Sequence, residues 1–182
     1  MPSTIETIKQ LWNILNFYPD FHDPVVAART EKFILTASTE DLFQLQKDLF
    51  DFAIPYFLED QRLRCIMEDF NGRKVGLAIA GEYGSTIIFR RDGFETVHDI
   101  GKGYPVFTIV SRQAYRDGVL KKVDPIKLVI ARKIKVKNIH ILARWALPHW
   151  KVLIDKTLFD KFLGYQDEVE GWISGELEKF GF

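Results

Sequence analysis

Residues 104–147 read YPVFTIVSRQAYRDGVLKKVDPIKLVIARKIKVKNIHILARWAL and say more about the fold than any other stretch. Apolar residues at the start of this stretch predict a strand, and the segment after it predicts a short helix. Asp124-Pro125 predicts a turn after this short helix. The expected order then continues with an apolar helix, a basic strand and an amphipathic helix over residues 125–131, 133–137 and 138–147.

Upstream of this stretch the sequence predicts strands that are separated by glycine-containing turns. The expected strands cover residues 75–81, 85–90, 94–100 and 104–111. Since short turns join consecutive antiparallel strands, we expect a meander, to which the basic strand adds a fifth member. The period of two puts Phe107 and Ile109 on one face of the sheet, and Val106, Thr108 and Val110 on the other.

Both ends of the chain read as helical. Helices are expected around Ile5–Leu15, after Asp23-Pro24 and after Ser38, the last one ended or kinked by Pro55. A helix over 56–70 ends at Asn71-Gly72. After Pro148, apolar residues predict further helices around 158–163 and 169–180.

Composition places the chain among ordinary globular proteins. It has 182 residues, of which 47% are hydrophobic and 14% aromatic, enough for one domain with a core. The 25 basic and 25 acidic side chains cancel, which argues against a uniformly basic surface for nucleic acid. One cysteine, Cys65, excludes an internal disulfide, and no signal peptide or 18-residue apolar run is visible. These features predict a cytoplasmic protein, with Cys65 as a buried, inert thiol beside Ile66 and Met67.

Tyr115–Pro125, YRDGVLKKVDP, resembles a segment of the sterol carrier protein 2 (SCP-2) lipid-transfer domain. In that family this segment joins the last meander strand to a helix that starts with proline. The following KIKVK and NIHILARW are similar to the family's short strand and the helix after it. The resemblance covers about residues 55–147. It departs where SCP-2 domains carry glycines beside the basic strand, because Ala131-Arg132 and Lys137 stand in those places.

The resemblance implies an α+β fold, with an antiparallel sheet of about five strands covered by helices. It implies an SCP-2-like core over residues 55–147, between an N-terminal helical extension (1–54) and a C-terminal one (148–182). The implied function is non-catalytic binding, and possible transfer, of a lipid, sterol, fatty acyl chain or prenyl quinone in an apolar tunnel. A tightly packed interior without a tunnel is the alternative. The expected lining residues are Phe107, Ile109, Leu120, Ile126, Val129, Ile130, Ile139, Leu142 and Trp145.

The basic strand predicts a charged outer face. Lys133, Lys135 and Lys137 share one side of it, and Ile134 and Val136 face inward. A solvated edge strand, on which lysines discourage aggregation, is one interpretation. Contact with anionic lipid head groups at a membrane is the other. Nucleic-acid binding is the least favoured, because aromatic residues do not alternate with the basic ones.

The chain has few candidates for catalysis. Its four histidines show no metal-ligand spacing, and no dinucleotide, P-loop or nucleophile-elbow motif occurs. We therefore expect no enzymatic activity, no cofactor and no metal. Two alternatives stay open: an accessory or scaffold protein that binds protein partners through its helical extensions, and an enzyme acting on an isoprenoid or acyl substrate. For the enzyme, polar groups would have to converge beside His98 or His140.

Overall fold

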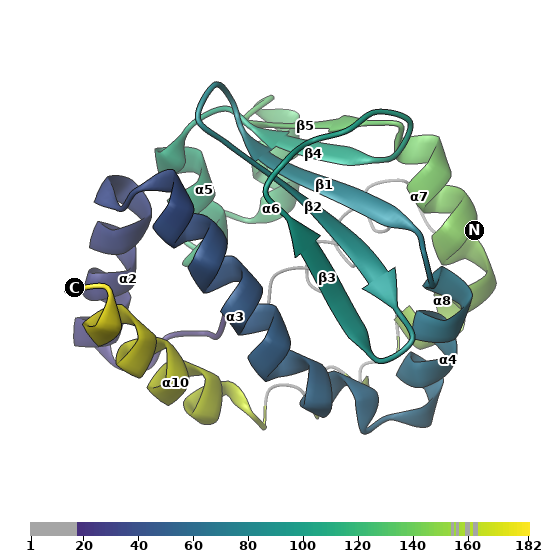
Figure 1. Ribbon diagram of the computed structural model, residues 1–182, viewed down its shortest axis with the longest axis horizontal. Helices are drawn as coiled ribbons and strands as arrows, with labels where there is room; N and C mark the ends of the chain where they lie inside the picture. The colour runs from purple at the N-terminus through teal and green to yellow at the C-terminus, as the bar shows by residue number, and fades with distance from the viewer. Residues whose placement is uncertain (1–17, 154, 156, 159–160, 162–163) are drawn as a thin grey trace.

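The computed structural model describes residues 18–153, 155, 157–158, 161 and 164–182 (Figure 1). The helix expected around Ile5–Leu15 and most of the one expected around 158–163 lie outside these residues. The helices are α2 (Pro24–Thr36), α3 (Thr39–Leu58), α4 (Gln61–Phe70), α5 (Arg112–Val119), α6 (Pro125–Ile130), α7 (Ile139–Ala146), the 3-10 helix η1 (Leu147–His149), α8 (Trp150–Leu153) and α10 (Gln166–Lys179). The strands are β1 (Lys74–Ile79), β2 (Tyr83–Arg90), β3 (Gly93–Val97), β4 (Val106–Ile109) and β5 (Ile134–Lys137).

The strands form one sheet in the order β3-β2-β1-β4-β5, which confirms the expected α+β fold with five strands and covering helices. One pairing differs from the expected antiparallel sheet, because β1 and β4 are parallel, with Leu77 opposite Phe107. The other three pairings are antiparallel. The physical reason is the connection after β3. Residues 98–105 cross the sheet in front of β2 and β1 (Figure 1), so β4 joins the edge of β1 instead of that of β3.

Small residues in β1 and β2 make room for this crossing segment. The side chain of Ile100 lies over Gly76 and Gly84, where added Cβ atoms would come within 3.0 and 2.7 Å of it. Thr86 adds a polar contact, since its hydroxyl donates to the Asp99 carbonyl at 2.6 Å. The glycines therefore serve close packing of the loop on the sheet face opposite the helices.

We expect the Gly84→Ala variant to lose about 1–3 kcal/mol of unfolding free energy, because the new methyl group overpacks against Ile100. Gly171→Ala is the matched control. A Cβ at Gly171, inside α10, meets nothing within 4 Å, so alanine should stabilise the helix by about 0.5–1 kcal/mol. Urea unfolding followed by circular dichroism gives both values. Equal effects of the two substitutions would show that Ile100 does not press on Gly84.

The helix starts in the sequence are confirmed by their caps. The side chains of Asp23 and Ser38 accept hydrogen bonds from backbone amides of the first turns of α2 and α3. Pro55 was expected to end or kink this helix. The expected end is wrong, because α3 continues through Pro55 to Leu58. Burial of Leu49 and Phe57 on either side holds the helix together past the missing N–H. The boundary expected between residues 54 and 55 thus falls inside α3.

One hydrophobic cluster runs through all three expected segments, from Tyr18 to Leu177. In α4 its members follow an i, i+3, i+4, i+7 stripe of Leu63, Ile66, Met67 and Phe70. Cys65 falls outside this stripe and is exposed, so the expectation of a buried thiol is wrong.

Left-handed residues flank β5. Arg132, before the strand, has φ 57°, and Asn138, after it, has φ 55°. Glycine adopts this conformation without steric cost. Asn138 also donates from its side-chain amide to the Tyr104 carbonyl at 3.0 Å, which fixes the turn into α7.

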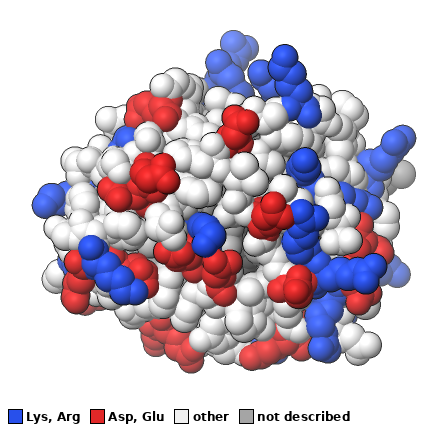
Figure 2. Space-filling view, in the orientation of Figure 1, with Lys and Arg blue, Asp and Glu red and all other residues white. Residues whose placement is uncertain are grey.

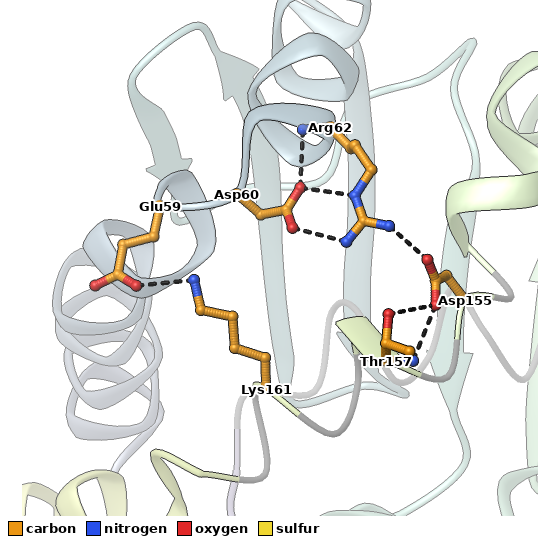
Figure 3. A network of polar contacts seen from close by, with 6 residues as sticks. All are labelled: Glu59, Asp60, Arg62, Asp155, Thr157 and Lys161. Carbon is orange, nitrogen blue, oxygen red and sulfur yellow. Dashed lines mark hydrogen bonds and ion pairs between the residues drawn. The ribbon is translucent and has the colours of Figure 1, made fainter.

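A polar network joins the α3–α4 junction to the chain beyond α8 (Figure 3). Arg62 donates from Nη2 and Nε to the Asp60 carboxylate at 2.8 and 3.0 Å, and its Nη1 pairs with Asp155. Lys161 pairs with Glu59 at 3.0 Å. The arginine therefore ties two segments together that are far apart in the sequence.

This network predicts acid sensitivity. Hydrogen bonds from Arg62 lower the pKa of Asp60 from its ordinary value of 3.8 to about 2. A lowered pKa means that the stabilisation is complete above the unfolded value and is lost as the pH falls from about 4 to about 2. We expect Asp60→Asn to be less stable than wild type by about 1 kcal/mol at pH 6, since solvent screens the half-exposed Arg62. The difference should vanish in thermal unfolding near pH 2. A difference independent of pH would contradict this assignment.

Candidate functional site: an apolar cavity between α4 and α7

A small cavity lies between one face of the sheet and the helices that cover it. Its volume is about 20 Å³, which is room for roughly one water molecule. The walls come from the end of α3, from α4, β1 and β2, and from α7 and α8. The lining side chains are all apolar or aromatic: Phe57, Leu63, Ile66, Met67, Phe70, Val75, Phe89, Leu142, Trp145 and Leu153. An apolar space of this kind is not a site for water, because water there finds no hydrogen-bond partners.

Phe70 is the central ring of the cavity wall. Its centroid lies 5.4 Å from that of Phe89 and 6.1 Å from that of Trp145. The His149 ring meets it edge-on at 5.6 Å, and His149 Nε2 lies 2.9 Å from a carboxylate oxygen of Asp69. Aromatic rings therefore form this part of the cavity wall, and the polar side chains of His149 and Asp69 lie beside them.

Arg73 belongs to the same border. Its guanidinium carbon lies 4.8 Å from the Phe70 centroid and 5.2 Å from the Trp145 centroid. Both distances are within the range of cation–π attraction. The arginine is half-buried, at the start of the segment that leads from α4 into β1.

Of the nine expected lining residues, Leu142 and Trp145 line the cavity. Phe107 and Ile109 are buried on the helix-covered face of the sheet, which confirms the predicted alternation of β4. Four further residues are half-buried: Leu120, Ile126, Val129 and Ile139.

Ile130 differs from the expected interior position, since its side chain is 71% exposed. It follows Leu128, which is 1% exposed, by two residues. Two residues correspond to about 200° around a helix, so Ile130 points away from the core.

Most of the cavity wall is not among the expected residues. The α4 side chains have a sequence signal, because the stripe from Leu63 to Phe70 marks a buried helix face. Val75 and Phe89 come together only through the antiparallel pairing of β1 with β2. No local pattern places them beside Leu153.

The expected alternation of β5 is confirmed. Lys133, Lys135 and Lys137 are exposed, and Ile134 is 3% exposed on the opposite side. Among the described residues no carboxylate pairs with these three lysines, although Lys121 pairs with Asp20. β5 is an edge strand, and Figure 2 shows Lys and Arg side chains projecting along the margin where Figure 1 places it. Membrane contact through these lysines stays a prediction.

Three of the four histidines, His22, His98 and His149, lie beside a carboxylate oxygen. His98 stacks on Phe43 with centroids 4.7 Å apart, and its Nδ1 lies 3.2 Å from Glu40. His140 is exposed. Neither His98 nor His140 is among the described residues that line the apolar cavity, and the enzyme alternative stays a prediction.

One group in the described part of the chain has the donor types of a cation site. Ligand atoms of His22, Asp167 and Glu170 lie within 4.8 Å of one another. The Glu170 carboxylate, however, already accepts from the backbone amides of His22 and Asp23 at 3.0 and 2.8 Å. His22 Nδ1 lies 3.0 Å from Asp167. The group thus acts as a link between α10 and the start of α2.

No helix among the described residues is both long and apolar enough to cross a membrane. Neither a protein-family model nor a curated protein matches the chain. Among solved structures, a chain named "UbiJ-SCP2 Ubiquinone synthesis protein" is similar, with a TM-score of 0.36 and 8% sequence identity. The comparison covers 68% of this chain and 93% of that one.

Proposed function

We propose that this chain binds a hydrophobic small molecule, without chemical change, at the apolar cavity between α4 and α7. The observation that carries the proposal is the wall itself, because all ten lining residues are apolar or aromatic. Burial of apolar surface supplies affinity without directional contacts. Walls of this kind suit an acyl chain, a prenyl chain or a sterol edge, and the described wall residues include no nucleophile or acid–base pair.

The cavity must widen to take such a ligand. Its volume of about 20 Å³ is too small for even a short piece of an acyl chain. Residues 139–153, which form the short helices α7, η1 and α8, contribute Leu142, Trp145 and Leu153 to the wall. Outward movement of this segment from α4 would extend the cavity along the aromatic wall. The apolar area that the ligand buries would offset the cost of separating the helices.

The test is native mass spectrometry of the purified protein, followed by solvent extraction and identification of any lipid. We expect a stoichiometric adduct. Its amount should fall in Val75→Phe, in which a larger side chain fills the cavity, and should not change in Val97→Phe, at an exposed valine of β3. A mass without adduct, together with no thermal stabilisation by a panel of fatty acids, sterols and quinones, would overturn the proposal.

The lysine face of β5 supports a second step, exchange of the ligand with an anionic membrane. Each basic side chain near such a surface contributes about 1 kcal/mol, and salt weakens the attraction. We expect Lys133→Glu, Lys135→Glu and Lys137→Glu together to abolish sedimentation with vesicles of phosphatidylserine and phosphatidylcholine at low salt. The control reverses three lysines of α2, α3 and α10: Lys32, Lys47 and Lys179. Unchanged vesicle binding by the β5 variant would exclude this face.

A further inference from the structure

We propose that Arg73 recognises an anionic head group, so that the ligand of the cavity is an amphiphile with a carboxylate or phosphate at one end. This inference rests on the proposed function and names its substrate class. The arrangement that carries it is a guanidinium without a carboxylate partner among the described residues. This guanidinium lies over the rings of Phe70 and Trp145, both of which line the apolar cavity.

The position of Arg73 is fixed by its backbone. Its N–H donates to the Phe70 carbonyl at 2.8 Å, and its carbonyl accepts from the Phe89 amide at 3.0 Å. Both partners line the cavity. The side chain therefore leaves from a hydrogen-bonded connection between α4 and β1, and its guanidinium lies over the rings of Phe70 and Trp145, which line the cavity.

The charge of Arg73 is not neutralised by any residue that the structure describes. Arg62, Arg90 and Arg112 each have a carboxylate partner. Among the residues that the structure describes, Arg73 has no ion pair, and its guanidinium donates no hydrogen bond. Asp69, one helical turn earlier, is paired instead with His149 at 2.9 Å. A half-buried guanidinium in this situation keeps five donors in a planar fork, the geometry that matches carboxylate and phosphate oxygens.

An anionic amphiphile satisfies both parts of the site at once. Its apolar chain would lie among the cavity side chains, and its head group would meet the guanidinium beside the rings of Phe70 and Trp145. Partial burial strengthens this charge-assisted contact relative to one in open water. A ligand with a neutral hydroxyl of the same chain length would make the apolar contacts and would lack the paired charges.

The experiment is isothermal titration calorimetry of the full chain with decanoate, decyl phosphate and 1-decanol. Wild type should bind the two anions at least about ten-fold more tightly than the alcohol, the scale of one hydrogen-bonded charge pair. Arg73→Met, which keeps an unbranched apolar stem over the rings, should lose that preference and bind 1-decanol unchanged. Arg73→Lys should keep part of it. Arg64→Met, at an exposed arginine of α4, is the matched control and should behave as wild type.

The outcomes separate the two proposals. Equal binding of all three probes by wild type and by Arg73→Met would overturn the head-group role and leave the apolar site standing. Equal loss of anions and alcohol in Arg73→Met would show that Arg73 only packs on the rings, which also overturns the inference. Binding of none of the probes by wild type would overturn both proposals. A preference for only one of the two anions would identify the head group as carboxylate or phosphate.

Discussion

We expect the Phe70→Ala variant to lose about 3–5 kcal/mol of unfolding free energy, the usual cost of removing a buried phenyl ring. Phe70 is 5% exposed and contacts the rings of Phe89, Trp145 and His149. Its removal takes away aromatic contacts from α7, β2 and the α7–α8 connection together. Phe70 already borders a cavity, so its removal enlarges an existing empty space. The cost of a large-to-small substitution rises with the volume of the cavity that is left.

Chemical denaturation with tryptophan fluorescence as the signal measures this loss. Phe70→Leu is the matched control, because leucine keeps most of the buried volume and should cost less than half as much. The alanine variant should also gain affinity for small apolar probes such as benzene, since the enlarged space stays dry. A loss below about 1 kcal/mol would mean that α7 is not held to α4 through this ring.

The second large effect is expected at Gln46, a buried polar residue on the apolar face of α3. Its side-chain oxygen accepts hydrogen bonds from the hydroxyls of Tyr83 and Ser85 on β2, the latter at 2.9 Å. All three residues are buried. Burial raises the pKa of Tyr83, so this hydroxyl stays neutral and acts as a donor. We expect Gln46→Leu to cost about 2–4 kcal/mol, because two buried hydroxyls lose their acceptor.

The cost should arise from the orphaned hydroxyls and not from the loss of the amide itself. The amide nitrogen of Gln46 already lacks an acceptor among the described residues, so its removal is favourable on its own. The triple variant Gln46→Leu, Tyr83→Phe, Ser85→Ala should therefore recover most of the stability of wild type. Urea unfolding of the single and triple variants gives the coupling. A triple variant that is less stable than Gln46→Leu would assign the role to packing.

Local patterns predict much of the fold. The starts of α2, α3 and α6 follow from Asp23, Ser38 and Asp124, because a cap is a contact between residues two or three positions apart. The strands and the lysine face of β5 follow from the period of two, which is a property of the extended chain alone. Pro55 shows the limit of such rules, since burial of its neighbours outweighs one missing hydrogen bond.

The candidate site lies largely beyond local patterns. Leu142 and Trp145 are expected from the resemblance to SCP-2 domains, and both line the cavity. The remaining wall unites residues from Phe57 to Leu153, which meet only after the helices have packed on the sheet. No local sequence pattern marks Arg73 either. Its guanidinium lies over the rings of Phe70 and Trp145, which come together only when α7 packs beside α4.

The type, order and inward faces of the elements thus follow from the amino-acid sequence, since these features depend on backbone geometry and on neighbours within one or two turns. Other features arise only when distant residues come into contact. They include the parallel pairing of β4 with β1, the outward position of Ile130, and the closure of the cavity between α4 and α7. Many alternative packings share the same local patterns, and the summed burial of the whole chain selects among them.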